Sequence, residues 1–109
     1  MRYLIILVGL LLCAAPAQAN EGMKGIQFLT EDFPPFNYLD KETNKPAGMA
    51  VDILRETLKR MNLAEADNEI KVVPWVRAYN TAQKQGARTV VFSTSFTEAR
   101  KKLFRWAGP

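Results

Sequence analysis

EIKVVPWVRAYNTAQKQGARTVVFS, residues 69–93, is the stretch that decides the expected fold. Its first part, Glu69 to Pro74, is a short apolar run that predicts a strand. Trp75 to Gln85 predicts a helix, which Gly86 ends. Arg88 to Ser93 predicts another strand. A helix between two strands is typical of parallel strands joined by a crossover, and it indicates an α/β fold.

The same alternation extends toward the N-terminus. Gly25 to Thr30 (GIQFLT) predicts a buried strand, bounded by a glycine and by a proline-containing loop. Met49 to Met61 predicts an amphipathic helix, because its apolar residues recur at helical spacing. These residues are Val51, Leu54, Leu58 and Met61. We therefore expect one mostly parallel sheet with flanking helices.

The C-terminal part of the chain continues the pattern in shorter pieces. Thr97 can cap a short helical turn that includes Arg100 and Lys101. Leu103 to Trp106 is interpreted as a fourth strand or its start. The sequence has no internal repeat and no flexible linker, which indicates one domain or one piece of a domain.

Three loops follow the carboxyl ends of the expected strands, where ligands bind in sheets of this kind. They carry aromatic rings, hydroxyl groups and one guanidinium: Phe33, Phe36, Trp75, Ser93, Thr94, Ser95 and Arg100. A guanidinium matches a carboxylate with two parallel hydrogen bonds, and aromatic rings can face an apolar body or an ammonium group. The combination predicts a site for a small zwitterion such as an amino acid. Glu31 or Asp32 would be the partner of its ammonium group.

Each of these residues also has a purely structural interpretation. Phe33 and Trp75 can be core residues, and serines in this position often bond to their own turn. Arg100 can be a solvated surface residue, and Arg77 can lie at the rim of a pocket or on the surface. The convergence of three loops at one edge of the sheet favours the functional interpretation.

Residues 1–19 have the pattern of a cleaved secretory signal peptide. Arg2 provides a positive charge, an uncharged apolar run follows, and Ala17-Gln18-Ala19 supplies small residues around a cleavage point. The run is shorter than the ~20 residues of a membrane span, so we expect no membrane anchor. A lipid-modified Cys13 is the alternative, and the large Leu12 before it argues against that.

The composition excludes several kinds of chemistry. After cleavage, residues 20–109 contain no cysteine and no histidine, which removes disulfides, the usual nucleophile pairs and the commonest metal ligands. The net charge of the whole chain is +4 and the basic residues are spread along it, whereas nucleic-acid binding needs a concentrated stripe. We expect no catalytic residues, no metal, no cofactor and no nucleic-acid partner.

Four blocks resemble, in this order, the bacterial extracellular solute-binding proteins of family 3: LTEDFPPFNY (29–38), GMAVDILRETLKRM (48–61), VVPWVRAYNTAQKQG (72–86) and STSFTEARKKLFRWAGP (93–109). Members are periplasmic receptors for polar amino acids that feed ABC transporters. The resemblance implies a type II periplasmic-binding-protein-like lobe, an amino-acid-like ligand and an ABC transporter permease as partner. Members have two lobes that close on the ligand. We therefore expect residues 20–109 to be the N-terminal part of one lobe, an incomplete fragment.

The resemblance also implies roles for single residues. The arginine that follows the family's SxSxTxxR pattern clamps the α-carboxylate of the ligand, and it falls on Arg100. The other residues of the pattern fall on Ser93, Ser95 and Thr97. The ring that stacks on the ligand falls on Phe33, and Trp75 holds a position that lines the pocket.

Two further functions are compatible with this sequence. An enzyme on the same fold, resembling the periplasmic cyclohexadienyl dehydratases, would use the same carboxylate clamp. The ligand-binding domain of a sensor or of a cell-wall lytic enzyme would also have these motifs. Because no residue has a defined catalytic role, we expect a binding protein and not an enzyme.

Overall fold

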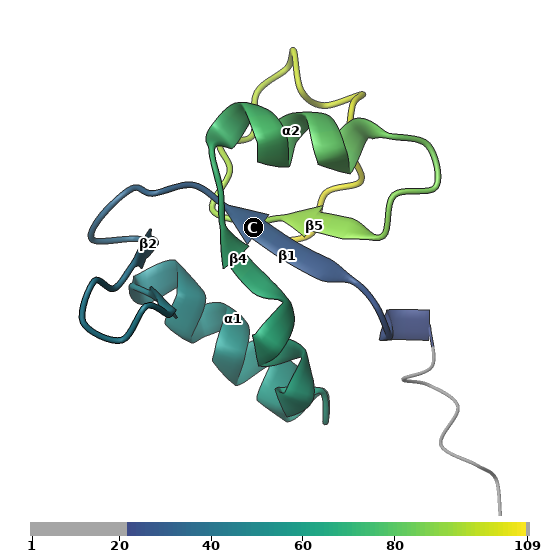
Figure 1. Cartoon of the computed structure of the whole chain (residues 1–109). Coiled ribbons are helices and arrows are strands. Elements are labelled where there is room, and N and C mark those ends of the chain that lie inside the picture. Colours follow the sequence, from purple (N-terminus) through teal and green to yellow (C-terminus); the bar gives the residue numbers. More distant parts are fainter. Residues whose placement is uncertain (1–21, 109) are drawn as a thin grey trace, which may run out of the picture.

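The structure is a computed structural model that describes residues 22–108. The expected signal peptide, residues 1–19, lies outside the described residues. Figure 1 shows a small sheet with α1 on one side and α2 on the other. The elements are β1 (Gln27–Thr30), β2 (Tyr38–Leu39), β3 (Pro46–Ala47), α1 (Met49–Arg60), the 3-10 helix η2 (Ala64–Glu69), β4 (Ile70–Val72), α2 (Trp75–Gln83) and β5 (Thr89–Val91).

The main sheet has the strand order β4-β1-β5, and both pairings are parallel. The central strand β1 aligns Phe28 with Ile70 on one side and with Val90 on the other. The expected fold class, α/β with a parallel sheet and flanking helices, is therefore confirmed.

The strand order determines where the two helices lie. The chain leaves β1 through α1 and reaches β4 on one side, then passes through α2 to β5 on the other side of β1. Because such crossovers are right-handed, opposite directions place the helices on opposite faces of the sheet. The connections that leave β1 and β4 run in opposite directions, and in open α/β sheets ligands bind outside the carboxyl ends of the strands at such a point.

The core lies between β1, β4 and α1. Its buried members are Phe28, Val51, Leu58, Leu63 and Ile70. Burying one such side chain stabilises the fold by about 1.5 to 3 kcal/mol. Leu29, next to Phe28 in β1, is also buried. Because side chains alternate along a strand, Leu29 lies on the opposite face of the sheet, toward α2, where Ala78 is fully buried. Of the predicted apolar helix face, Met61 lies outside the helix and is exposed.

The first turn of α1 holds the loop that follows β1. Gly48 precedes the helix and provides no side-chain cap. Instead, the N–H of Met49 donates to the carbonyl of Pro35 (3.3 Å), and that of Ala50 donates to the carbonyl of Phe36 (2.8 Å). These bonds satisfy N–H groups that lack partners within the helix, and they attach the aromatic loop to a rigid element.

Part of the expected loop between β1 and α1 is a small antiparallel hairpin, β2–β3. Tyr38 pairs with Ala47 and Leu39 pairs with Pro46. The Asp40 carboxylate accepts hydrogen bonds from the N–H groups of Glu42 (2.7 Å) and Thr43 (3.2 Å), and so it holds the turn. Strands of two residues are too short to leave a periodic pattern in the sequence.

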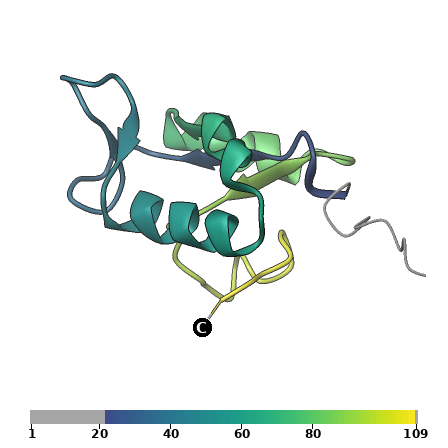
Figure 2. The same cartoon turned by 90° about the horizontal axis from the view of Figure 1, so that it is seen from below.

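Two predicted elements need correction. Leu103 to Trp106 is not a fourth strand, because residues 98–104 form turns and a bend and residues 105–108 have no regular structure. Its aromatic rings pack on one another and on α2 instead: Phe104 contacts Tyr79 and Trp106. The second helix ends at Gln83, two residues earlier than expected, because Lys84 is already extended. In Figure 2 the C-terminal segment, in yellow, runs as an irregular loop.

Candidate ligand-binding cleft

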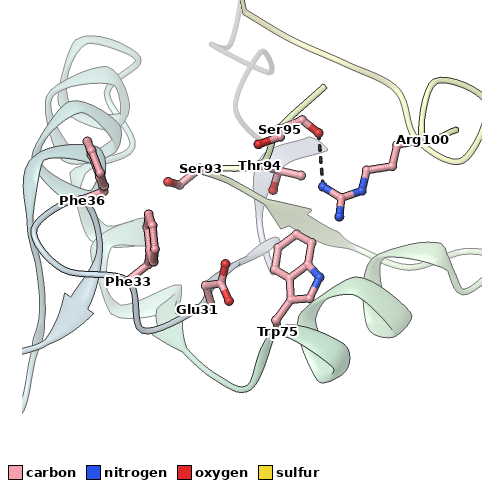
Figure 3. A pocket seen from close by; sticks show the side chains of 8 residues that line it. All are labelled: Glu31, Phe33, Phe36, Trp75, Ser93, Thr94, Ser95 and Arg100. Atoms are coloured by element: carbon pink, nitrogen blue, oxygen red, sulfur yellow. Dashed lines mark hydrogen bonds between the residues drawn. The ribbon is translucent and has the colours of Figure 1, made fainter. Parts of the chain in front are cut away.

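A cleft of about 530 Å³ lies at the carboxyl ends of the parallel strands. Its lining residues come from the loops that follow β1 and β5 and from the first residue of α2, after β4 (Figure 3). They are Glu31, Phe33, Phe36, Trp75, Ser93, Thr94, Ser95 and Arg100. The cleft thus occupies the place that the strand order predicts for a ligand.

The loop after β1 contributes an aromatic pair. The rings of Phe33 and Phe36 stack with centroids 5.7 Å apart and an interplanar angle of 16°. Their exposures of 56% and 45% are high for phenylalanine, so the rings are not core residues. The turn between them is closed by backbone bonds from the N–H groups of Phe36 and Asn37 to the carbonyl of Phe33.

Asn37 fixes the start of the same loop. Its side chain is almost fully buried, and its amide nitrogen donates to the carbonyl of Glu31 over 2.5 Å. This bond connects the two ends of the aromatic turn. The Glu31 side chain is half-buried and lines the cleft between the phenylalanine pair and Trp75 (Figure 3).

Trp75 follows β4 directly and is the first residue of α2. The N–H of Val73 donates to the carbonyl of Thr30 over 2.8 Å, so the end of β4 stays aligned with the end of β1. Pro74, the residue before the helix, has its φ fixed by its ring. The indole of Trp75 is therefore held on rigid backbone at the edge of the cleft.

The loop after β5 turns sharply at Ser93. This residue has φ of 59°, a left-handed conformation that is unusual for serine. Such conformations persist only where the surrounding structure maintains them, and they are concentrated at functional sites. Further along, the N–H of Arg100 donates to the Thr97 hydroxyl (3.3 Å) and to its carbonyl (3.0 Å), so Thr97 caps the turn as predicted.

Arg100 lies over two aromatic rings at the end of the cleft. Its guanidinium carbon is 5.3 Å from the ring centroid of Trp75 and 5.5 Å from that of Tyr79. One guanidinium nitrogen donates to the carbonyl of Ser95 over 3.3 Å. Within residues 22–108, Arg100 makes no ion pair. Most of its donors are therefore available to an anion.

The structure brings together most of the predicted site residues. Phe33, Trp75, Ser93, Ser95 and Arg100 all line the cleft, and so does Glu31. The remaining candidates Asp32, Arg77 and Thr97 are exposed and do not line it. Thr97 acts on the site through the backbone of Arg100.

Sequence reasoning missed Tyr79. This half-buried side chain is one helical turn after Trp75 and lies under the guanidinium of Arg100. The available signal was the spacing of four residues between two aromatic side chains, which places both on one helix face.

The cleft has one cationic end and one acidic group. Arg100 with Ser93 and Ser95 can donate hydrogen bonds to an anion, and the Glu31 carboxylate can accept them from a cationic group. The exposed rings of Phe33 and Phe36 offer apolar contact in the same cleft. The described part of the chain holds no cluster of acidic residues suited to a metal ion. None of the helices within residues 22–108 is long and apolar enough to span a bilayer.

These features define an α/β lobe with an open cleft at the carboxyl ends of its parallel strands. The model of the bacterial extracellular solute-binding proteins, family 3, matches residues 26–109, and the chain belongs to this family. The match includes every residue that lines the cleft. No curated protein and no solved structure matches the chain.

Proposed function

We propose that the cleft binds an amino acid or a similar small polar molecule with a carboxylate group. The chain would act as a periplasmic receptor that delivers this ligand to an ABC-type transporter. Membership of a solute-binding family supports the general function. The signal-peptide pattern of residues 1–19 supports export, and mature protein that begins at Asn20 is the result expected from mass spectrometry.

The single observation that carries the proposal is the environment of the Arg100 guanidinium. This guanidinium lies over two rings, lines the cleft beside Ser95, and has no carboxylate partner among the described residues. A guanidinium in this arrangement pairs most favourably with a planar anion such as a carboxylate.

The remaining lining residues support a zwitterionic ligand. Glu31 would accept hydrogen bonds from an ammonium group, and the exposed pair of Phe33 and Phe36 would contact the ligand's carbon skeleton. A phosphorylated ligand is less well supported, because the cleft has one basic side chain and one acidic side chain.

The test is thermal stabilisation of the purified protein by a panel of free amino acids and their α-carboxamides. Arg100→Ala should abolish stabilisation by the free acids, because loss of one partner of such a pair costs on the order of 2 to 5 kcal/mol. Lys101→Ala is the matched control, since it removes the neighbouring positive charge from an exposed side chain that does not line the cleft. Unchanged binding of free amino acids by Arg100→Ala would contradict the carboxylate assignment.

A further inference from the structure

The segment that carries Arg100 has no strand or helix of its own between residues 92 and 108. Its position must therefore be maintained by side-chain contacts. Two of these contacts converge on Tyr79 of α2. The Arg100 guanidinium lies 5.5 Å from its ring centroid, and the Phe104 ring packs edge-on at 5.4 Å with an interplanar angle of 68°.

Tyr79 is also the junction of a longer series of rings. On one side it lies 5.6 Å from Trp75. On the other side, Phe104 contacts Trp106 at 5.8 Å, and Trp106 contacts Phe96 at 5.0 Å. Phe96 precedes Arg100 whereas Phe104 and Trp106 follow it, so these rings connect the two ends of the loop, and Phe104 attaches the loop to α2.

The geometry leaves the donors of Arg100 available. The N–H bonds of a guanidinium lie in its plane, whereas aromatic rings contact its face. Trp75 and Tyr79, one turn apart on α2, lie beneath the group, and the hydrogen bond that its side chain makes within residues 22–108 goes to the Ser95 carbonyl. A flexible arginine would have to be ordered on each binding event, at a cost in affinity.

We propose that Tyr79 is a positioning residue of the cleft, which together with Trp75 seats the guanidinium of Arg100 and anchors its loop through Phe104. The expected effect on ligand affinity rests on the proposed function, whereas the positioning of Arg100 by Tyr79 does not. Tyr79 does not line the cleft, so it acts through Arg100 and not by touching the ligand.

The first experiment needs no ligand. Nearby ring faces shift the NMR resonance of the Arg100 Nε–H group. This resonance is assigned by its disappearance in the Arg100→Lys variant. Tyr79→Phe keeps the ring and should keep the shifted position. Tyr79→Leu should move the resonance toward that of solvated arginines, and Val76→Ala, at a position 67% exposed on the same helix, should not. An unchanged resonance in Tyr79→Leu would contradict the proposal that Tyr79 positions the Arg100 guanidinium.

The second experiment measures affinity for the panel of free amino acids and α-carboxamides. Tyr79→Leu should weaken binding of the free acids by roughly 5- to 30-fold, and Tyr79→Phe should not. Binding of the carboxamides should change little. In the Arg100→Ala background, Tyr79→Leu should have no further effect. Equal losses for acids and carboxamides would mean a merely structural role and would overturn the proposal.

Two outcomes separate this inference from the proposed function. If no amino acid binds the wild-type protein but the Arg100 resonance depends on Tyr79, the proposed function is wrong and the positioning role of Tyr79 is confirmed. If Tyr79→Leu does not fold, Phe104→Leu replaces it, since this change removes the loop anchor and keeps Trp75 and Tyr79. It should also shift the Arg100 resonance, and an unchanged resonance would contradict the anchoring role.

Discussion

The hydroxyl of Thr30 donates a hydrogen bond to the backbone carbonyl of Phe92 over 3.2 Å. Thr30 is the last residue of β1 and Phe92 directly follows β5, so the bond joins the two strand ends between which the cleft opens. The Thr30 side chain is fully buried, whereas Phe92 is half-buried. The left-handed turn at Ser93 begins one residue later.

We expect Thr30→Val to destabilise the protein by about 1 kcal/mol, because the carbonyl of Phe92 loses the Thr30 donor and keeps the longer bond from the Thr94 hydroxyl (3.5 Å). The measurement is urea-induced unfolding. Thr57→Val is the control, since the Thr57 hydroxyl donates to the Ile53 carbonyl on an exposed helix face. That change should stay within about 0.5 kcal/mol. Equal effects of the two substitutions would show that the bond between the strand ends has no special importance.

Glu31 and Asp32 are adjacent carboxylates with different predicted effects on binding. Only Glu31 lines the cleft. We expect Glu31→Gln to weaken binding of free amino acids by about 10-fold or more, because it removes a charged hydrogen-bond acceptor. Asp32→Asn should leave affinity unchanged, and calorimetry on both variants makes the comparison. A larger loss from Asp32→Asn would mean that the ammonium group lies elsewhere.

Local patterns in the sequence were sufficient to predict the main elements and most of the residues that line the cleft. The apolar runs around Phe28 and Ile70 and the spacing of Val51 and Leu58 predicted the central strands and α1, and these residues form the core. Because ligand positions in parallel sheets follow from topology, correct strands also placed Ser93 correctly at the cleft.

The features that sequence reasoning missed depend on contacts between distant segments. Leu103 to Trp106 has the composition of a strand, but its rings pack on Tyr79 and on one another, which a linear pattern does not reveal. The same holds for Tyr79 under Arg100, a contact between residues that are 21 positions apart. For Leu103 to Trp106, tertiary packing overrode local propensity.

Gly48 and Gly86 both have positive φ, 111° and 74°, but their surroundings differ. A Cβ at Gly48 would lie 2.5 Å from the carbonyl oxygen of Phe36, whereas nothing lies within 4 Å of one at Gly86. We expect Gly86→Ala to cost about 1 kcal/mol in unfolding free energy. Gly48→Ala should cost a further 1 to 3 kcal/mol, roughly, and should also weaken ligand binding, because Phe36 must move. Similar stabilities of the two variants would exclude close packing at Gly48.

Ser93 combines a left-handed backbone with a hydroxyl in the cleft, so its substitutions should separate stability from binding. Ser93→Gly and Ser93→Ala both remove the hydroxyl, and we expect both to weaken binding of free amino acids to a similar extent. Glycine adopts positive φ without a Cβ penalty, whereas alanine does not. Ser93→Gly should therefore be more stable than Ser93→Ala by about 1 kcal/mol in urea-induced unfolding. If the alanine variant is the more stable one, the left-handed conformation at residue 93 is wrong; if both variants bind normally, the hydroxyl does not contact the ligand.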